Sequence, residues 1–140
     1  MKVVGLNGRE YNIDTKKYAL KHNDSRKKSK YHLQARDFLN SYFSGYSILE
    51  EVKLPGTTNP ANHSALFLDF FIPSFKIGIE VHGEQHYTYC PFFHKNKAGY
   101  YRSNHRDNVK KNWCDLNKVE LIIFKYSDGP EIWRNQLEHK

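Results

Sequence analysis

Two carboxylates interrupt the most apolar stretches of this chain. Asp69 stands inside residues 66–72 and Glu80 inside residues 77–81, where most neighbours are large and apolar. A carboxylate in a buried strand is costly unless it is paired, hydrogen-bonded or bound to a metal ion. If the two strands form an antiparallel hairpin across residues 73–75, both carboxylates face the same side of the sheet. Converging carboxylate oxygens suit a hard divalent ion such as Mg²⁺, which activates water and stabilises a reacting phosphate.

Each carboxylate also has a simpler interpretation. Asp69 can be an exposed residue on a strand face that happens to lie between aromatic side chains. Glu80 can be a solvated residue on a half-exposed strand, because glutamate is mostly found at the surface. The large apolar neighbours on both sides of Asp69 favour the functional interpretation, while both interpretations remain open for Glu80.

Two histidines and a further aspartate extend this set. His82 and His86 follow the end of the second acidic strand, and Asp107 lies in a predicted helix. Imidazole titrates near neutral pH, so a histidine beside a metal centre can orient or deprotonate water. The alternatives are surface histidines and a solvated aspartate, because Asp107 lies on the helix side away from Val109 and Trp113.

Taken in order and spacing, Asp69, Glu80 and His82 resemble the signature of the PD-(D/E)XK nuclease superfamily. The string Val81-His82-Gly83 is similar to the very-short-patch repair endonucleases and to the related EDxHD phage homing endonucleases. The resemblance covers roughly residues 29 to 126, and the ordered set is more specific than any single piece. Further agreements are Leu54-Pro55-Gly56, Pro73, His86, Arg106-Asp107 and the apolar strand 121–124.

The resemblance implies a restriction-endonuclease-like α/β core, with a mixed β-sheet flanked by helices, and a role for each matched residue. Asp69 would be the principal metal ligand, and the main-chain carbonyl of Val81 a second metal contact. His82 would orient or deprotonate the attacking water, or contact the scissile phosphate. His86 would be a second histidine at the phosphate. Asp107 would fix a histidine tautomer or join the water network.

The chain departs from the family pattern at several positions. His82 stands where most of the superfamily has lysine, and Gln34 is nearest to the glutamate expected on the first helix. Glu84 stands in place of a cysteine of the structural zinc site, so we do not predict that site. Glu80 matches the superfamily acid, and we count it as catalytic and metal-binding, although the very-short-patch branch does not require an acid there.

The surrounding pattern predicts the elements that position these residues. Residues 1–28 are expected to form a basic arm or hairpin, and residues 29–140 the nuclease domain. The order helix, strand, strand, strand, helix, strand, helix favours a mixed sheet with helices on its faces. A hairpin is predicted in residues 1–14, with its turn at Asn7-Gly8, and strands are predicted over 47–54, 65–72, 76–81 and 119–126. Helices are predicted over 31–44, where Asn23-Asp24-Ser25 can cap the start, over 103–117, with Val109, Trp113 and Leu116 on one face, and over 131–140. Residues 87–101 are predicted to be irregular.

Length and composition exclude several classes. The 140 residues suffice for one ordinary domain, and an aromatic content of 15% argues against simple disorder. No apolar run approaches the 20 or so residues of a membrane helix, and no signal-peptide core is visible. The two cysteines, Cys90 and Cys114, do not make a disulfide framework, so we expect a protein of a reducing, cytoplasmic compartment. Such a protein could be encoded by a phage. An open alternative is that Cys90, His94 and Cys114 come together in the folded chain.

The charge balance points to a polyanionic partner. There are 22 Lys and Arg against 15 Asp and Glu, which leaves a net charge of +7. Lysine and arginine neutralise phosphates without reading sequence. The aromatic pairs 92–93 and 100–101 either insert between bases or simply close the core. The predicted DNA-binding residues are Arg26, Lys27, Lys28, Lys30, Arg102, Arg106, Lys110 and Lys111.

These features together predict a Mg²⁺-dependent (or Mn²⁺-dependent) endonuclease that cuts DNA by attack of a metal-activated water. DNA is the expected partner, with no membrane, and a homodimer or a separate specificity factor would supply target choice. Two alternatives stay open: a decayed nuclease fold that only binds DNA, and a protein-interaction module on the same fold.

Overall fold

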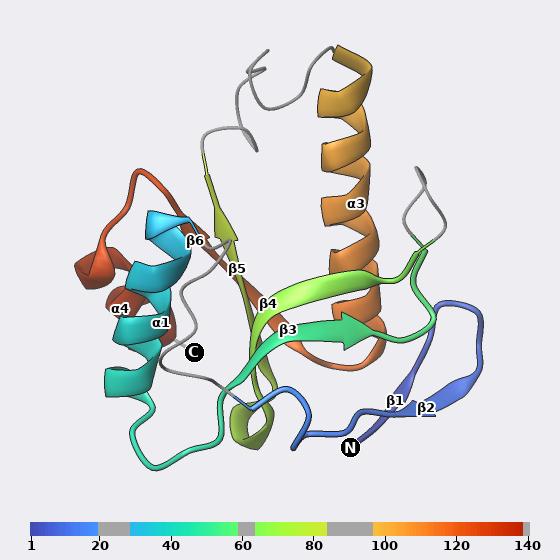
Figure 1. Ribbon diagram of the computed structural model, residues 1–140, viewed down its shortest axis with the longest axis horizontal. Coiled ribbons are helices and arrows are strands. Elements are labelled where there is room, and N and C mark those ends of the chain that lie inside the picture. Colours follow the sequence, from blue (N-terminus) through green and yellow to red (C-terminus); the bar gives the residue numbers. More distant parts are fainter. Residues whose placement is uncertain (20–28, 59–63, 84–96, 139–140) are drawn as a thin grey trace.

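The computed structural model describes residues 1–19, 29–58, 64–83 and 97–138, with residues 97–104 described by their backbone alone. Within these ranges the chain forms a mixed α/β structure, as predicted (Figure 1). None of the helices in these ranges is long and apolar enough to cross a lipid bilayer. The elements are β1 Lys2–Val4, β2 Glu10–Asn12, α1 Lys30–Tyr42, β3 Leu49–Leu54, β4 Leu66–Ile72, the 3₁₀ turn Pro73–Phe75, β5 Ile77–His82, α3 Lys97–Leu116, β6 Glu120–Lys125 and α4 Pro130–Glu138.

A four-stranded mixed sheet forms the centre of the molecule. Its strand order is β3-β4-β5-β6; the pairs β3–β4 and β4–β5 are antiparallel, and the pair β5–β6 is parallel. The predicted hairpin of the two acidic strands is confirmed, with the pairs Phe70↔Ile79 and Ile72↔Ile77. Helix α3 runs from β5 back to β6 and lies on one side of the sheet, while α1 and α4 lie on the other (Figure 1).

The α1 and α4 side of the sheet holds an aromatic core. The helix predicted over 31–44 is observed as α1, and its apolar stripe of Ala35, Phe38 and Leu39 is buried against the sheet. Phe124 of β6 stacks on Trp133 of α4 with ring centroids 4.7 Å apart, and Phe38 meets both rings edge-on. Aromatic contacts of this kind add to the burial free energy. They join α1, β6 and α4 in one hydrophobic core.

A second core lies on the α3 side and includes the N-terminal hairpin. Val3 of β1 is buried there together with Leu68 of β4 and Trp113 of α3. Asn117 follows α3 and pairs with the backbone of Val4 in both directions, accepting from its N–H at 2.7 Å and donating to its carbonyl at 2.8 Å. The hairpin predicted around Asn7-Gly8 is therefore observed, and it packs against the sheet and α3.

The alternation of β4 side chains between the two faces of the sheet is interrupted at Asp69. Leu68 and Phe71 both belong to the core on the α3 side, whereas Phe70 lies in the core on the α1 side. Strict strand alternation would place Leu68 and Phe70 on one face. The neighbouring strand β3 has Glu51 in the left-handed region at φ 50°, opposite this change. The two strands therefore bend together at Asp69, where the candidate site lies.

Two expectations from the sequence are corrected by the structure. Residues 97–101, predicted to be irregular, belong to α3, since a helix tolerates Gly99 at a cost of about 1 kcal/mol. Leu116 is 48% exposed, because the packed face of α3 passes instead through Trp113 and Cys114. Ser29 is the N-cap of α1 and accepts a hydrogen bond from the His32 N–H. The cap predicted at residues 23–25 lies outside the described residues.

The close approach of two glycines fixes the hairpin against β3. Leu6 N–H donates to the Gly56 carbonyl at 3.2 Å, and a Cβ on Gly56 would overlap the Gly5 Cα. Gly56→Ala is expected to destabilise the protein by roughly 3 kcal/mol, because it adds this overlap to the strain of a positive φ. Gly8→Ala has the same positive φ but open space, and should cost only about 1 kcal/mol. Urea unfolding of both variants measures the difference, and equal losses would contradict the packing explanation.

Candidate metal centre

The site begins where β4 and β5 separate. Their backbone pairing reaches only to Phe70↔Ile79 at this end, and the next residues exchange side-chain hydrogen bonds instead. The Asp69 N–H donates to Glu80 Oε2 at 2.8 Å, and the Val81 N–H donates to Asp69 Oδ2 at 2.8 Å. Each carboxylate therefore satisfies an amide of the other strand that the sheet leaves unpaired. This reciprocal pair holds both carboxylates at the same place.

A lysine from α3 completes the environment of Glu80. Lys110 Nζ lies 2.5 Å from Glu80 Oε1, and the two side chains are 17% and 3% exposed. Glu80 is thus fully buried with both oxygens engaged, one by the β4 backbone and one by an ammonium group. The interpretation of Glu80 as a solvated surface residue is wrong.

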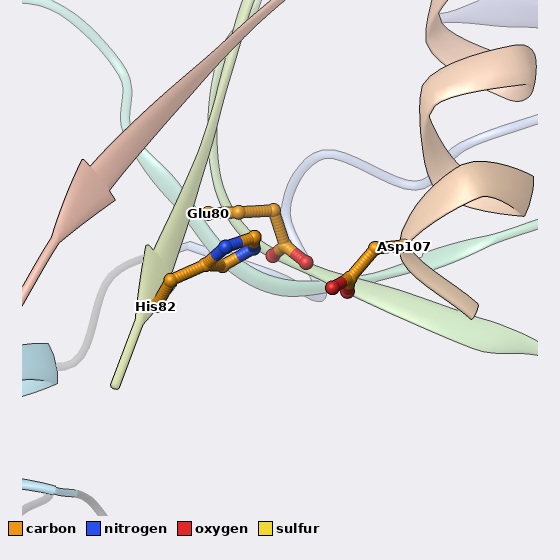
Figure 2. Close-up of side chains that lie close together, drawn as sticks. All are labelled: Glu80, His82 and Asp107. Carbon is orange, nitrogen blue, oxygen red and sulfur yellow. The ribbon is translucent and has the colours of Figure 1, made fainter. Parts of the chain in front are cut away.

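Glu80, His82 and Asp107 bring their polar atoms together beside this pair. One ligand atom from each lies within 4.8 Å of the others, a spacing that could hold a metal ion. Glu80 and His82 alternate with Val81 on β5 and so point to the α3 side, where Asp107 reaches them from the helix (Figure 2). Asp107 and Lys110 are three residues apart on α3 and hence on the same helix face. Asp107 therefore faces the sheet, although it lies away from Val109 as predicted.

The electrostatics of the centre reflect crowded carboxylates. Burial, together with the neighbouring charge of Glu80, holds the pKa of Asp69 well above its usual range. Burial alone would lower the pKa of Lys110, but the charges of Glu80 and Asp69 raise it. Lys110 is therefore a firmly charged ammonium among three carboxylates. A centre of this kind gains from any added positive charge.

A cavity connects the centre to the surface along α3 and β6. Its volume is about 460 Å³, and His82 and Asp107 line it together with Asn108 and Lys111. The far wall is formed by β6, the edge strand of the sheet. The cavity therefore gives solvent and ligands a route to the His82 and Asp107 side of the centre.

The remaining predicted site residues fall in three groups. Val81 contributes its amide to Asp69, and a metal contact of its carbonyl stays a prediction. Lys30 lies over the Tyr31 ring, Arg106 is half-buried on α3, and Lys111 is exposed and paired with Asp115 at 3.1 Å. His86, Arg26, Lys27 and Lys28 lie outside the described residues, as do Cys90, His94 and the aromatic pair at 92–93. Of Arg102 and the aromatic pair at 100–101 only the backbone is described.

Sequence reasoning missed a buried polar cluster on the other face of the sheet. Glu50 of β3 accepts hydrogen bonds from Arg36 at 2.9 Å and lies 2.7 Å from His32 Nε2, both on α1. Burial would raise the pKa of Glu50, but the His32 and Arg36 contacts outweigh it and lower that pKa. His32 also stacks on Phe70, next to Asp69. The available signal was two basic residues, four apart, beside the apolar stripe of α1.

Cys114 is buried in the α3-side core and forms no disulfide with any of the residues that the structure describes. Burial, with a smaller effect of the Glu80 charge, raises the pKa of its thiol to about 12. A thiol with such a pKa is protonated at neutral pH and is a poor metal ligand or nucleophile. Cys114 therefore acts as a small core residue.

Comparisons with known proteins find uncharacterized viral proteins as relatives and assign no function. The chain is 36% identical over 89 residues to "Uncharacterized protein 307L" of Invertebrate iridescent virus 6, 38% identical over 69 residues to "Uncharacterized protein 033L" of Invertebrate iridescent virus 3, and 37% identical over 79 residues to "Uncharacterized protein 094L" of Frog virus 3. These matches cover 62%, 49% and 56% of this chain, and 45%, 36% and 51% of the relatives. The chain thus spans about half the length of these relatives or less. No family model and no solved structure matches it.

Proposed function

We propose that this protein is a metal-dependent endonuclease that hydrolyses DNA phosphodiester bonds. The observation that carries the proposal is the convergence of Glu80, His82 and Asp107 within 4.8 Å, directly beside the Asp69–Glu80 pair. Two carboxylates and an imidazole, with the Asp69 carboxyl group beside them, suit the chemistry of a divalent cation site. The resemblance to PD-(D/E)XK nucleases in the order of these residues supports the same proposal.

The donor set fits a hard or borderline divalent ion. Carboxylate oxygens suit Mg²⁺ and Mn²⁺, and an imidazole nitrogen is also acceptable to Mn²⁺. Glu80 and Asp107 would hold the ion, with Asp69 as a further oxygen donor next to Glu80. When bound, it would supply a Lewis acid that lowers the pKa of water and balances charge on a phosphate.

The chain's own groups would then act around the substrate. His82 lies at the cavity and can take a proton from the attacking water. Asp107, within reach of His82, can hold the imidazole in one orientation. Asp69 and Glu80 keep their positions through the amides of Val81 and Asp69, so the carboxylates need no rearrangement when a substrate arrives.

Positive side chains near the cavity support a nucleic-acid substrate. Lys111 lines the cavity, and Arg106 precedes Asp107 on α3. The net charge of +7 gives the same direction of attraction for the whole chain. DNA would therefore approach along α3, with its backbone phosphate toward His82.

Plasmid cleavage with and without Mn²⁺ or Mg²⁺ tests the proposal. We expect the wild type to cut only with the metal, and His82→Ala to lower the rate by at least about a hundredfold, because it removes the proton acceptor. His105→Ala is the control for loss of a histidine, since His105 is an exposed residue of α3 outside the centre. DNA binding should persist in both variants, as measured by gel shift at low salt.

The outcomes separate the proposal from its rivals. Cleavage by His82→Ala at the wild-type rate would contradict the assigned chemistry. Tight DNA binding by the wild type without metal-dependent cleavage would favour a decayed nuclease fold that only binds DNA. Absence of DNA binding at low salt would favour a protein-interaction module.

A further inference from the structure

Lys110 places a positive charge inside the candidate metal centre. Its Nζ lies 2.5 Å from Glu80 Oε1, and Glu80 is also one of the three residues whose ligand atoms converge. Asp107, another of the three, stands one helical turn before Lys110 on α3. The ammonium thus reaches Glu80 from the same helix that carries Asp107.

The two oxygens of Glu80 are held in different ways. Oε2 accepts from the Asp69 N–H, a backbone group fixed by the β4–β5 hairpin. Oε1 accepts from the Lys110 ammonium, which stands at the end of a side chain with four flexible methylenes. Oε1 is therefore the oxygen that can change its partner without moving the sheet.

We propose that Lys110 is an internal competitor for the metal ion at Glu80, an inference that rests on the proposed metal-dependent function. An ammonium and a divalent cation on neighbouring positions of one carboxylate repel each other strongly in a buried site. The Lys110 ammonium would therefore have to leave Glu80 Oε1 for an ion to bind there. Lys110 stabilises the carboxylates while the metal is absent and lowers the affinity of the centre for it.

The neighbouring lysine provides a matched control. Lys111 is 63% exposed and pairs with Asp115 on the surface of α3, so its loss changes the net charge by the same single unit. Lys110→Met and Lys111→Met therefore differ in the contact with Glu80 and not in overall charge. Lys110→Gln is a second variant for the case that Lys110→Met is too unstable to measure. Its neutral amide can still donate a hydrogen bond to Glu80.

Mn²⁺ binding by isothermal titration calorimetry, without DNA, is the test. We expect Lys110→Met and Lys110→Gln to bind Mn²⁺ roughly tenfold more tightly than wild type and Lys111→Met. The same variants should show a larger rise in melting temperature when Mn²⁺ is added, because the metal replaces the lost counter-charge.

Two results would overturn the inference in distinguishable ways. Mn²⁺ affinity in both Lys110 variants equal to or weaker than in Lys111→Met would refute the competition and leave the metal centre standing. No Mn²⁺ binding by any variant would refute both the competition and the proposed metal-dependent function. Binding detectable only in the Lys110 variants would support the competition in its strongest form.

Discussion

Asp69→Asn is expected to lower metal-dependent plasmid cleavage by at least about a hundredfold while leaving the protein folded. The substitution removes a carboxyl group that can ionise next to Glu80 but keeps an oxygen that can accept from the Val81 N–H. The amide can offer a divalent cation no negative charge, whereas the hydrogen bond that positions the residue is retained. Cleavage and thermal unfolding of the same preparation measure the two effects.

The difference in stability between Asp69→Asn and the wild type depends on pH. The pKa of Asp69 is raised in the folded protein by burial and then by Glu80. Its contribution to stability is therefore complete below its unfolded pKa and is lost as the pH rises through the folded pKa. Since asparagine mimics the protonated form, Asp69→Asn should equal or exceed the wild type in melting temperature at neutral pH. Asp37→Asn, which changes an exposed residue of α1, is the control. Cleavage by Asp69→Asn at the wild-type rate would refute the assignment of Asp69 to the site.

Glu50→Ala is expected to cause the largest loss of stability, about 3–5 kcal/mol, without touching the metal centre. Glu50 joins the edge strand β3 to α1 through Arg36 and His32, and removing it leaves the Arg36 guanidinium, which is 4% exposed, without a counter-charge. Urea unfolding at neutral pH measures the loss. Glu138→Ala, which breaks an exposed pair with Arg134 at 4.0 Å, should change stability by less than about 0.5 kcal/mol.

The pH profile of Glu50→Ala distinguishes the ion pair from packing. Hydrogen bonds from His32 and Arg36 outweigh burial and lower the pKa of Glu50 in the folded protein. Its contribution is therefore present above the unfolded pKa of about 4.3 and is lost as the pH falls through the folded pKa. The stability difference between wild type and variant should shrink on acidification. A difference that stays constant would assign the loss to packing alone.

Many elements of the fold could be predicted from local sequence patterns. Three of them depend on neighbours in the chain and were predicted: helix α1, the turn at Asn7-Gly8 and the short connection between the two acidic strands. The start of α3 was not, because Gly99 reads as a helix breaker when its backbone partners are unknown. Leu116 was misassigned for a similar reason, since the packed face of a helix is decided by what covers it.

The candidate site divides in the same way. Apolar neighbours around Asp69 and Glu80 marked both as unusual in the sequence, because a buried carboxylate needs a partner. The identity of those partners could not be read from the chain. Lys110 is 30 residues from Glu80, and Arg36 is 14 residues from Glu50. Such pairings depend on how a helix rotates and docks on the sheet.

The sequence by itself determined that two acidic strands form a hairpin and that histidine follows the second of them, because strand alternation and short connections are local properties. Only the tertiary structure decided what faces the carboxylates. The bend at Asp69 separates β4 from β5 and turns their amides to the two side chains, and the docking of α3 brings Asp107 and Lys110 to Glu80. Long-range packing sets both, so a lysine expected at the DNA surface lies instead inside the candidate metal centre.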